Sequence, residues 1–357
     1  MKRNWKLALL LALVTGVALS SIAQGRQPPK PGRILFARFD ALYLTETSGT
    51  QSRLLAEGIR AAALSPDGDL LAYADEKAVR VLSLVSGQSA TLGDLKEGRI
   101  EGLTWSPTQT SVAYTVAQSN GSSLFLAAYP PRNEPPRNLG PWYETISFSP
   151  DGKLLLHPAF LAGSTNHGLE VVHVDTGKRD VVFAAPDLRH IFEAEYSPDG
   201  SHIAFTLSQP PPPASPEDEP DCSEPELHLW VLAVGSKSPV EIDLSRVHKE
   251  WTNVKDFDWS PDGEFLAVGI GTVDCDYPGS ANGVIVTSLD QTVQFKLSRG
   301  QQSLGALFAP DGKKAVFTEY GDYGTHPQLV IGDLATRKLT PIPNTRSDEV
   351  PTALDWK

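Results

Sequence analysis

The chain has 357 residues, 40% of them hydrophobic, and its formal net charge at neutral pH is −12. This acidic balance argues against nucleic acid and anionic lipid as partners, because both require a basic surface. The length exceeds that of an ordinary single domain, although one closed repeat architecture could contain the whole chain.

The first 23 residues have the pattern of a secretory signal peptide. Met1–Lys6 is basic, Leu7–Leu19 is apolar, and Ser21-Ile22-Ala23 matches a small-x-small cleavage site. The apolar core is shorter than a comfortable membrane span of about 20 residues. We therefore expect a periplasmic or secreted protein with no membrane insertion after cleavage. Residues 24–32, rich in proline, are predicted to form a linker before a single domain over 33–357.

Three short β-segments follow the linker, at Ile34–Arg38, Ala41–Thr47 and Ser52–Glu57. They match the second, third and fourth strands of a unit that recurs later in the chain. No first strand precedes them. The first unit is therefore predicted to lack its own inner strand.

A turn sequence then recurs along the chain. In Ser65-Pro66-Asp67-Gly68 the proline presets φ for a type I turn, the aspartate tolerates the second corner, and the glycine takes a positive φ. Copies stand at Ser149–Gly152, Ser197–Gly200 and Ser260–Gly263, with variants at Ser106–Gln109 and Ala309–Gly312. Successive prolines are 41, 43, 48, 63 and 49 residues apart. This period, with β-rich content, is typical of a propeller.

Large apolar residues flank each turn at fixed offsets, as expected of sheets that stack on one another. Two residues before the six prolines stand Leu64, Trp105, Phe148, Tyr196, Trp259 and Phe308. Seven residues after them stand Tyr73, Tyr114, His157, Phe205, Val268 and Phe317. His157 is the polar member of this set, and we interpret it as a hydrogen-bonded core histidine.

Each repeat continues with a third and a fourth strand, which makes four antiparallel strands, A to D, with the turn joining A to B. The chain ends in Thr352–Lys357, where Asp355-Trp356 copies Asp258-Trp259. We therefore predict that this segment supplies the missing inner strand beside Ile34–Arg38 and closes the ring. The predicted fold is an all-β, seven-bladed β-propeller, with six blades as the alternative.

The repeated aromatic-Ser-Pro-Asp-Gly, with strands such as His202–Phe205 and Leu229–Leu232, resembles the TolB-like, WD-like propeller repeat over residues 33–357. The resemblance implies a β-propeller and, as in TolB-like proteins, a periplasmic partner-binding role. It does not imply one activity, because similar propellers also gate serine peptidases. The sequence after the leader has no Gly-x-Ser-x-Gly, His-Glu-x-x-His or Walker-type motif.

Loop length predicts the recognition surface. A–B and C–D turns lie on one face and are short, whereas B–C and D–A connections lie on the opposite face. The long B–C loops are expected at Gln118–Ser122, Phe160–Gly168, Ser208–Pro225, Thr272–Asn282 and Tyr320–Pro327. On this face we predict a binding site formed by Asp221, Asp274, Asp276, Tyr277 and Tyr323, with Tyr320 as a further aromatic candidate.

The only cysteines, Cys222 and Cys275, fall in equivalent loops of neighbouring blades. In an exported protein they are predicted to form a disulfide. Acidic residues surround them, including Asp221, Asp274 and Asp276. Crowded carboxylates can bind Ca²⁺, but the spacing matches no calcium-loop motif, so we predict no metal site and no cofactor, with Ca²⁺ as the weaker alternative.

Four histidines fall on the same face: His167 and His326 in B–C loops, His190 and His248 in D–A loops. They could bind a metal or move protons, but their irregular spacing favours ordinary surface histidines. The favoured function is a monomeric, non-catalytic module that binds a protein or cell-envelope component. The alternatives are a hydrolase or lyase with its site at the central channel mouth, and a structural scaffold of an envelope complex.

Overall fold

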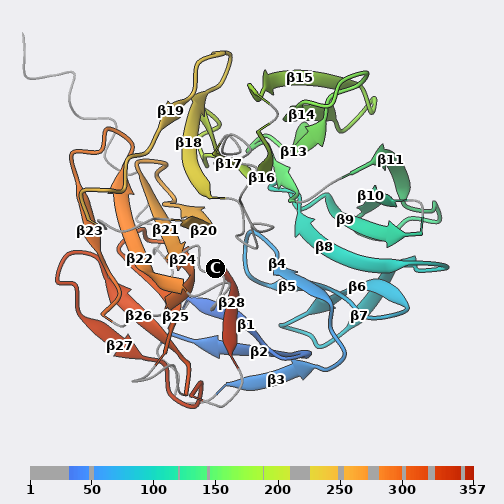
Figure 1. Cartoon of the computed structure of the whole chain (residues 1–357). Coiled ribbons are helices and arrows are strands. Elements are labelled where there is room, and N and C mark those ends of the chain that lie inside the picture. The colour runs from blue at the N-terminus through green and yellow to red at the C-terminus, as the bar shows by residue number, and fades with distance from the viewer. Residues whose placement is uncertain are drawn as a thin grey trace, which may run out of the picture. The chain divides into compact units, whose positions relative to one another are not determined.

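A computed structural model describes residues 32–47, 52–119, 121–142, 145–187, 189–209, 226–247, 253–271, 281–299, 303–320, 326–346 and 350–357. These residues form seven four-stranded antiparallel sheets arranged as the blades of a β-propeller (Figure 1). The predicted fold class is confirmed, with seven blades rather than the alternative six. The predicted signal peptide and all of the linker except Gly32 lie outside the described residues.

The blades are numbered along the chain, and in each the first strand given is the innermost. Blade 1 consists of β4 (Ala61–Leu64), β5 (Leu70–Ala74), β6 (Ala78–Ser83) and β7 (Ser89–Asp94). Blade 2 consists of β8 (Arg99–Trp105), β9 (Ser111–Gln118), β10 (Gly121–Ala128) and β11 (Arg137–Pro141). Blade 3 consists of β12 (Ser147–Phe148), β13 (Leu154–Phe160), β14 (His167–His173) and β15 (Arg179–Ala184).

The remaining blades follow the same plan. Blade 4 consists of β16 (Ile191–Tyr196), β17 (His202–Ser208), β18 (Leu227–Ala233) and β19 (Val240–Glu241). Blade 5 consists of β20 (Asn253–Trp259), β21 (Phe265–Gly271), β22 (Ala281–Ser288) and β23 (Gln294–Lys296). Blade 6 consists of β24 (Ser303–Phe308), β25 (Lys314–Glu319), β26 (Gln328–Asp333) and β27 (Leu339–Pro341).

Blade 7 joins the two ends of the domain, as predicted. It consists of β28 (Pro351–Trp356), β1 (Arg33–Arg38), β2 (Ala41–Glu46) and β3 (Arg53–Ala56). Ile34 pairs with Trp356 and Arg38 with Pro351, and a bulge between Leu35 and Phe36 interrupts the register. β28 covers the hydrogen-bonding edge of β1 and becomes the innermost strand, so this blade has four strands like the other six.

The Ser-Pro-Asp-Gly turns owe their conformation to a repeated set of hydrogen bonds. In the copy that begins at Ser197, the serine hydroxyl donates to Asp199 at 2.6 Å and accepts from the backbone N–H of His202 at 2.9 Å. Gly200 takes a φ of 72°, a conformation in which a Cβ atom would be strained. In the variant turn at Ser106–Gln109 a non-glycine residue, Gln109, accepts a φ of 56°.

The predicted core positions lie between the blades. Trp105, Trp259 and Trp356 are all buried, and the Trp105 indole N–H also donates to the Ala63 carbonyl of the preceding blade at 3.1 Å. His157 is buried, stacks on Trp142 with ring centroids 3.8 Å apart, and has its Nε2 3.1 Å from an Arg179 guanidinium nitrogen. The interpretation of His157 as a hydrogen-bonded core histidine is therefore confirmed.

The loop prediction needs two corrections. The connection expected at Gln118–Ser122 is a tight hairpin, since β9 continues to Gln118 and β10 begins at Gly121. The longest described connection on the turn side, residues 129–136 between β10 and β11, is not short. The described ends of the remaining long B–C segments, and the described parts of D–A connections such as 242–247, lie on one face, which we call the long-loop face.

Candidate functional site

The five residues predicted to form the binding site all lie outside the described part of the chain. This applies to Asp221, Asp274, Asp276, Tyr277 and Tyr323, to the proposed disulfide partners Cys222 and Cys275, and to His248. The further aromatic candidate, Tyr320, is described and partly buried. The candidate site is therefore built from the described strands and loop ends that border these segments.

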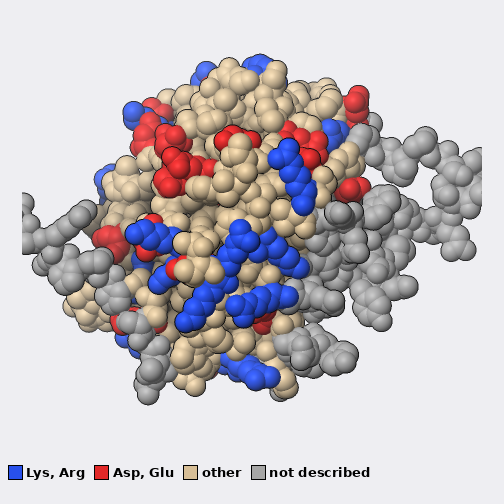
Figure 2. Space-filling view, turned by 90° about the vertical axis from the view of Figure 1, so that its left-hand side faces the viewer, with Lys and Arg blue, Asp and Glu red and all other residues tan. Residues whose placement is uncertain are grey.

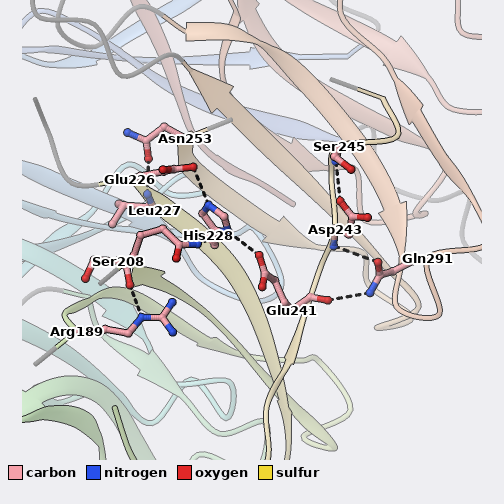
Figure 3. Close-up of polar contacts among 11 residues, drawn as sticks. Arg189, Ser208, Glu226, Leu227, His228, Glu241, Asp243, Ser245, Asn253 and Gln291 are labelled. Carbon is pink, nitrogen blue, oxygen red and sulfur yellow. Dashed lines mark hydrogen bonds and ion pairs between the residues drawn. The ribbon is translucent and has the colours of Figure 1, made fainter. Parts of the chain in front are cut away.

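A histidine held between two carboxylates anchors the ends of segment 210–225 (Figure 3). His228 on β18 has its Nε2 2.9 Å from a Glu226 carboxylate oxygen and its Nδ1 2.5 Å from a Glu241 carboxylate oxygen. The side-chain amide of Gln209, at the other end of the segment, lies 2.8 Å from the same Nδ1. These contacts connect Gln209 and Glu226, the described residues on either side of 210–225, through His228 to Glu241 on β19.

Two of the predicted histidines come together at the boundary of blades 3 and 4. His167 begins β14 and His190 directly precedes β16, and their ring centroids are 4.6 Å apart. Phe160 packs edge-on against His167 at 4.2 Å, and Phe192 lies 6.3 Å from His190. Phe160 nevertheless keeps 50% of its area exposed. We call these four residues the aromatic–histidine cluster.

The environment of His167 defines its protonation state. Its Nδ1 accepts the backbone N–H of Ile191 at 3.2 Å, so in the neutral ring the proton is on Nε2. Burial, followed by the neighbouring His190, lowers the pKa of His167. A neutral His167 therefore offers a hydrogen-bond donor, and its Nδ1 is engaged and unable to act as a general base without breaking this bond.

A second group of polar side chains belongs to the innermost strands. In blade 3 this side chain is that of Ser147, which stands two residues before the first residue of the turn. Its hydroxyl accepts a hydrogen bond from the backbone N–H of Tyr196 in the next blade at 3.1 Å. Asp258 in the same position accepts the N–H of Phe308 at 2.6 Å, and Asp355 accepts the N–H of Leu64 at 3.0 Å. These bonds join blade 3 to 4, blade 5 to 6, and blade 7 to 1.

The junction of blades 4 and 5 departs from this pattern. Glu193 and Glu195 on β16 occupy the positions of Asp256 and Asp258 on β20, yet the carboxylate of neither glutamate accepts a hydrogen bond from any residue that the structure describes. Burial and the charge of Asp258 raise the pKa of Glu195 to about 8, and burial raises the pKa of Asp258 to about 7. Burial and the charge of Glu195 also hold the pKa of Glu193 well above its usual range.

These four residues, Glu193, Glu195, Asp256 and Asp258, form a group that we call the inner carboxylates. The Lys357 ammonium group partly offsets their negative charge, and the nearby Asp355 carboxylate raises the pKa of Lys357. The described residues contain no group of three or more His, Cys, Asp or Glu that could hold a metal ion. Crowded acids with raised pKa values can hold a proton near neutral pH or attract a cationic group.

Comparison with known proteins identifies the fold. No protein-family model matches the chain, and no curated protein matches it. Among solved structures, a putative TolB from Agrobacterium tumefaciens matches with 17% identity and a TM-score of 0.52, covering 79% of this chain and 95% of that one. The chain has the fold of a TolB-like β-propeller.

The same fold serves proteins with different activities. An oligogalacturonate lyase from Vibrio parahaemolyticus matches with 16% identity and a TM-score of 0.59, over 87% of this chain and 85% of that one. A puromycin-hydrolyzing peptidase from Mycobacterium tuberculosis matches with 12% identity and a TM-score of 0.63, over 87% of this chain but only 52% of its own. At these identities the likeness concerns the fold alone, so the site has to be argued from this chain's residues.

The TolB-like propeller also carries a basic region that its net charge conceals. Figure 2 shows Lys and Arg side chains gathered on the side of the propeller that bears the outer strands of blades 5 and 6. Exposed basic residues in these blades include Arg299, Lys313, Lys314, Arg337, Lys338 and Arg346. The net charge of the chain is therefore a poor guide to the partners that this side could bind.

Within the described residues there is no helix of a length and apolarity that would let it cross a membrane.

Sequence reasoning missed Phe160, Phe192 and the inner carboxylates. A signal for the carboxylates was present, because Glu193-x-Glu195 and Asp256-x-Asp258 occupy equivalent places before two turn copies. Alignment of the repeats on their turns would have placed both pairs on innermost strands. The aromatic–histidine cluster has no such signal, since its members come from loop ends of two blades.

Proposed function

We propose that this chain is an exported, non-catalytic binding module that recognises a protein or another cell-envelope component through its long-loop face. The aromatic–histidine cluster carries the proposal. Phe160 is a large apolar side chain that stays half exposed although ring partners hold it, and exposed aromatic anchors of this kind dominate binding energy at interfaces. The leader pattern in residues 1–23 supports export.

The chemistry of the site favours a partner segment that presents a positive charge beside an apolar group. Aromatic faces attract ammonium and guanidinium groups. A cationic group would favour loss of the protons that the inner carboxylates hold near neutral pH, and the neutral His167 adds no repulsion. The predicted acidic residues Asp221, Asp274 and Asp276 would add negative charge along the same face. Electrostatic attraction of this kind raises the rate of association at low salt.

The experiment is a pull-down from native envelope extract with the parent protein and with Phe160→Ala and His190→Ala. We expect either variant to weaken capture of the specific partner by about tenfold or more, because interface aromatics commonly contribute at least about 2 kcal/mol. Val85→Ala, which truncates an exposed apolar residue on the turn side, is the matched control and should bind as the parent does. Equal capture by all four proteins would remove the cluster from the binding site.

Salt dependence tests the electrostatic part separately. Association of the purified partner should slow as salt rises, and Asp221→Asn, Asp274→Asn and Asp276→Asn together should reduce that dependence. Charge reversal at Asp67 and Asp151, on the turn side, is the control. If association depends on Asp67 and Asp151 alone, the partner binds the turn side and the assignment to the long-loop face is wrong.

A hydrolase or lyase is the second candidate, and the raised pKa of Glu195 favours it. An acid with a pKa of about 8 is protonated at neutral pH and could act as a general acid. Turnover of an envelope substrate by purified protein, lost in Glu195→Gln, would replace the binding module with this alternative. Partner contacts spread over the basic side of blades 5 and 6 would instead favour a scaffold.

A further inference from the structure

A cavity of about 410 Å³ lies between blades 1 and 2, apart from the aromatic–histidine cluster and the inner carboxylates. Blade 1 contributes Val79 and Gly93, and blade 2 contributes Tyr114, Val116 and Phe125. The connection between the blades closes one end, and residues 135–136, which precede β11, form a further wall. Its volume falls in the range of small-molecule sites, roughly 300–1,000 Å³.

The walls of this cavity are mainly apolar and include a flat aromatic surface. Tyr114 and Phe125 stack with ring centroids 5.6 Å apart and ring planes 15° from parallel. Pro136 lies close to Gly93, so close that a Cβ atom at Gly93 would stand 2.6 Å from the proline ring. The charged residues Asp94, Lys96 and Glu97 are of both signs. This lining favours an uncharged, flat, largely apolar molecule.

One polar group in the cavity has no partner among the described residues. Tyr114 is 5% exposed and its hydroxyl forms no hydrogen bond with them, but the hydroxyl oxygen is not one of their fully buried unpaired atoms, so it opens onto the cavity. The hydroxyl lies beside Gly93, since a Cβ atom built there would be 2.9 Å from it. A hydroxyl that has no protein partner and opens onto a cavity can donate a hydrogen bond to a ligand. Burial raises the pKa of Tyr114 to about 12, so the hydroxyl stays protonated and available as a donor.

We propose that this cavity binds a small, uncharged aromatic molecule whose carbonyl or ether oxygen accepts a hydrogen bond from Tyr114. The ring of the ligand packs against Phe125 and Pro136, where apolar area is removed from water. The ligand oxygen accepts the hydrogen bond that the Tyr114 hydroxyl offers at the cavity wall. This site is independent of the partner surface proposed above, because the two share no residue.

The probes are acetophenone and ethylbenzene, which have the same ring and nearly the same shape but differ in the carbonyl. Their affinities are measured by titration with ligand-observed NMR on the full folded protein. We expect acetophenone to bind several-fold more tightly than ethylbenzene. Tyr114→Phe should weaken acetophenone binding by about three- to tenfold and leave ethylbenzene binding almost unchanged, because a single neutral hydrogen bond is removed.

Tyr73→Phe is the matched control, because Tyr73 occupies the equivalent position in blade 1 and does not line the cavity. It should bind both probes as the parent does. Gln118→Phe adds a bulky ring at an exposed position of the cavity wall, where it should not impair folding, and should abolish binding of both probes. The proposal is overturned if neither probe binds at millimolar concentration, if Gln118→Phe binds both normally, or if a folded Tyr114→Phe keeps the preference for acetophenone.

Discussion

The two faces of the propeller are built on opposite plans. On the turn side, Ser197 with Asp199 and Ser260 with Asp262 form nearly the same hydrogen bonds, at 2.6 and 2.5 Å. On the long-loop face two described contact sets differ: blades 3 and 4 meet in the aromatic–histidine cluster, whereas His228 of blade 4 lies between two carboxylates. Repetition stabilises the ring, and departures from it supply the chemistry.

The same contrast holds among the innermost strands. The Asp258 carboxylate accepts a hydrogen bond from the backbone N–H of Phe308 in the next blade. Glu195, in the equivalent place, accepts no such bond through its carboxylate within the described residues, and its pKa is raised to about 8. Two differences distinguish Glu195 from Asp258: its side chain is longer by one methylene group, and the charge of Asp258 acts on it. Equivalent positions can therefore be structural in one blade and chemically distinct in another.

The closing strand should give the largest effect, because it completes the repeated plan. Trp356→Ala removes a buried indole from between blades and should lower the free energy of unfolding by about 3–5 kcal/mol. Deletion of residues 352–357 should lower the melting temperature further. The control is Leu354→Ala on the same strand, where the side chain is 37% exposed. A truncated protein that melts like the parent would contradict closure by β28.

Next comes the inner position that joins blades 5 and 6. Asp258→Ala leaves the backbone N–H of Phe308 without its acceptor and should cost about 1–3 kcal/mol in urea unfolding. Glu195→Ala breaks no equivalent bond, so its effect should be within about 1 kcal/mol. Equal losses in the two variants would mean that both junctions are built alike.

The pH dependence of stability sharpens this comparison. The pKa of Glu195 is higher in the folded chain, about 8, than the ordinary value of 4.5. The folded state therefore holds this proton more tightly than the unfolded state does. The contribution of Glu195 to the free energy of unfolding is complete below pH 4.5 and is lost as the pH rises toward 8. Glu195→Gln should flatten this decline, with a gain of roughly 1–2 kcal/mol at pH 8. Parallel stability curves for parent and variant between pH 4.5 and 8 would exclude a raised pKa.

The smallest effect is expected on the turn side. Hydrogen bonds from Ser197 and Ser201 lower the pKa of Asp199 to about 2. Its contribution is present above the ordinary pKa of 3.8 and is lost as the pH falls toward 2. Because the side chain is exposed, Asp199→Ala should cost only about 0.5–1 kcal/mol at pH 7. Asp311→Ala, in the turn that lacks the serine, should cost less when thermal unfolding is compared.

Much of the ring could be predicted because its information is local and repeated. The turn residues specify their own geometry, and the offsets of Trp105, Trp259 and His157 place them between blades without reference to the rest of the chain. Even the closure followed from two residues, since Asp355-Trp356 repeats Asp258-Trp259. Strand ends differed from expectation by one or two residues, where hydrogen bonding rather than side-chain pattern decides.

The site was less predictable because its contacts are not repeated. His167 and His190 were placed on the correct face, but their ring contact depends on where β14 begins relative to the start of β16. The high pKa of Glu195 depends on burial and on Asp258 in another blade, which no local pattern reports. The residues predicted to bind a partner, such as Asp221 and Tyr323, stay predictions.

The pairing of β28 with β1 also sets an order of events during synthesis. Residues 39–350 are added between these two strands, which takes roughly 15–60 s at about 5–20 residues per second. Throughout that interval β1 presents a bare edge, able to pair with any extended chain nearby. A nascent chain of this protein is thus most vulnerable to misassembly at β1, and the yield of correctly folded protein depends on what shields that edge until β28 is made.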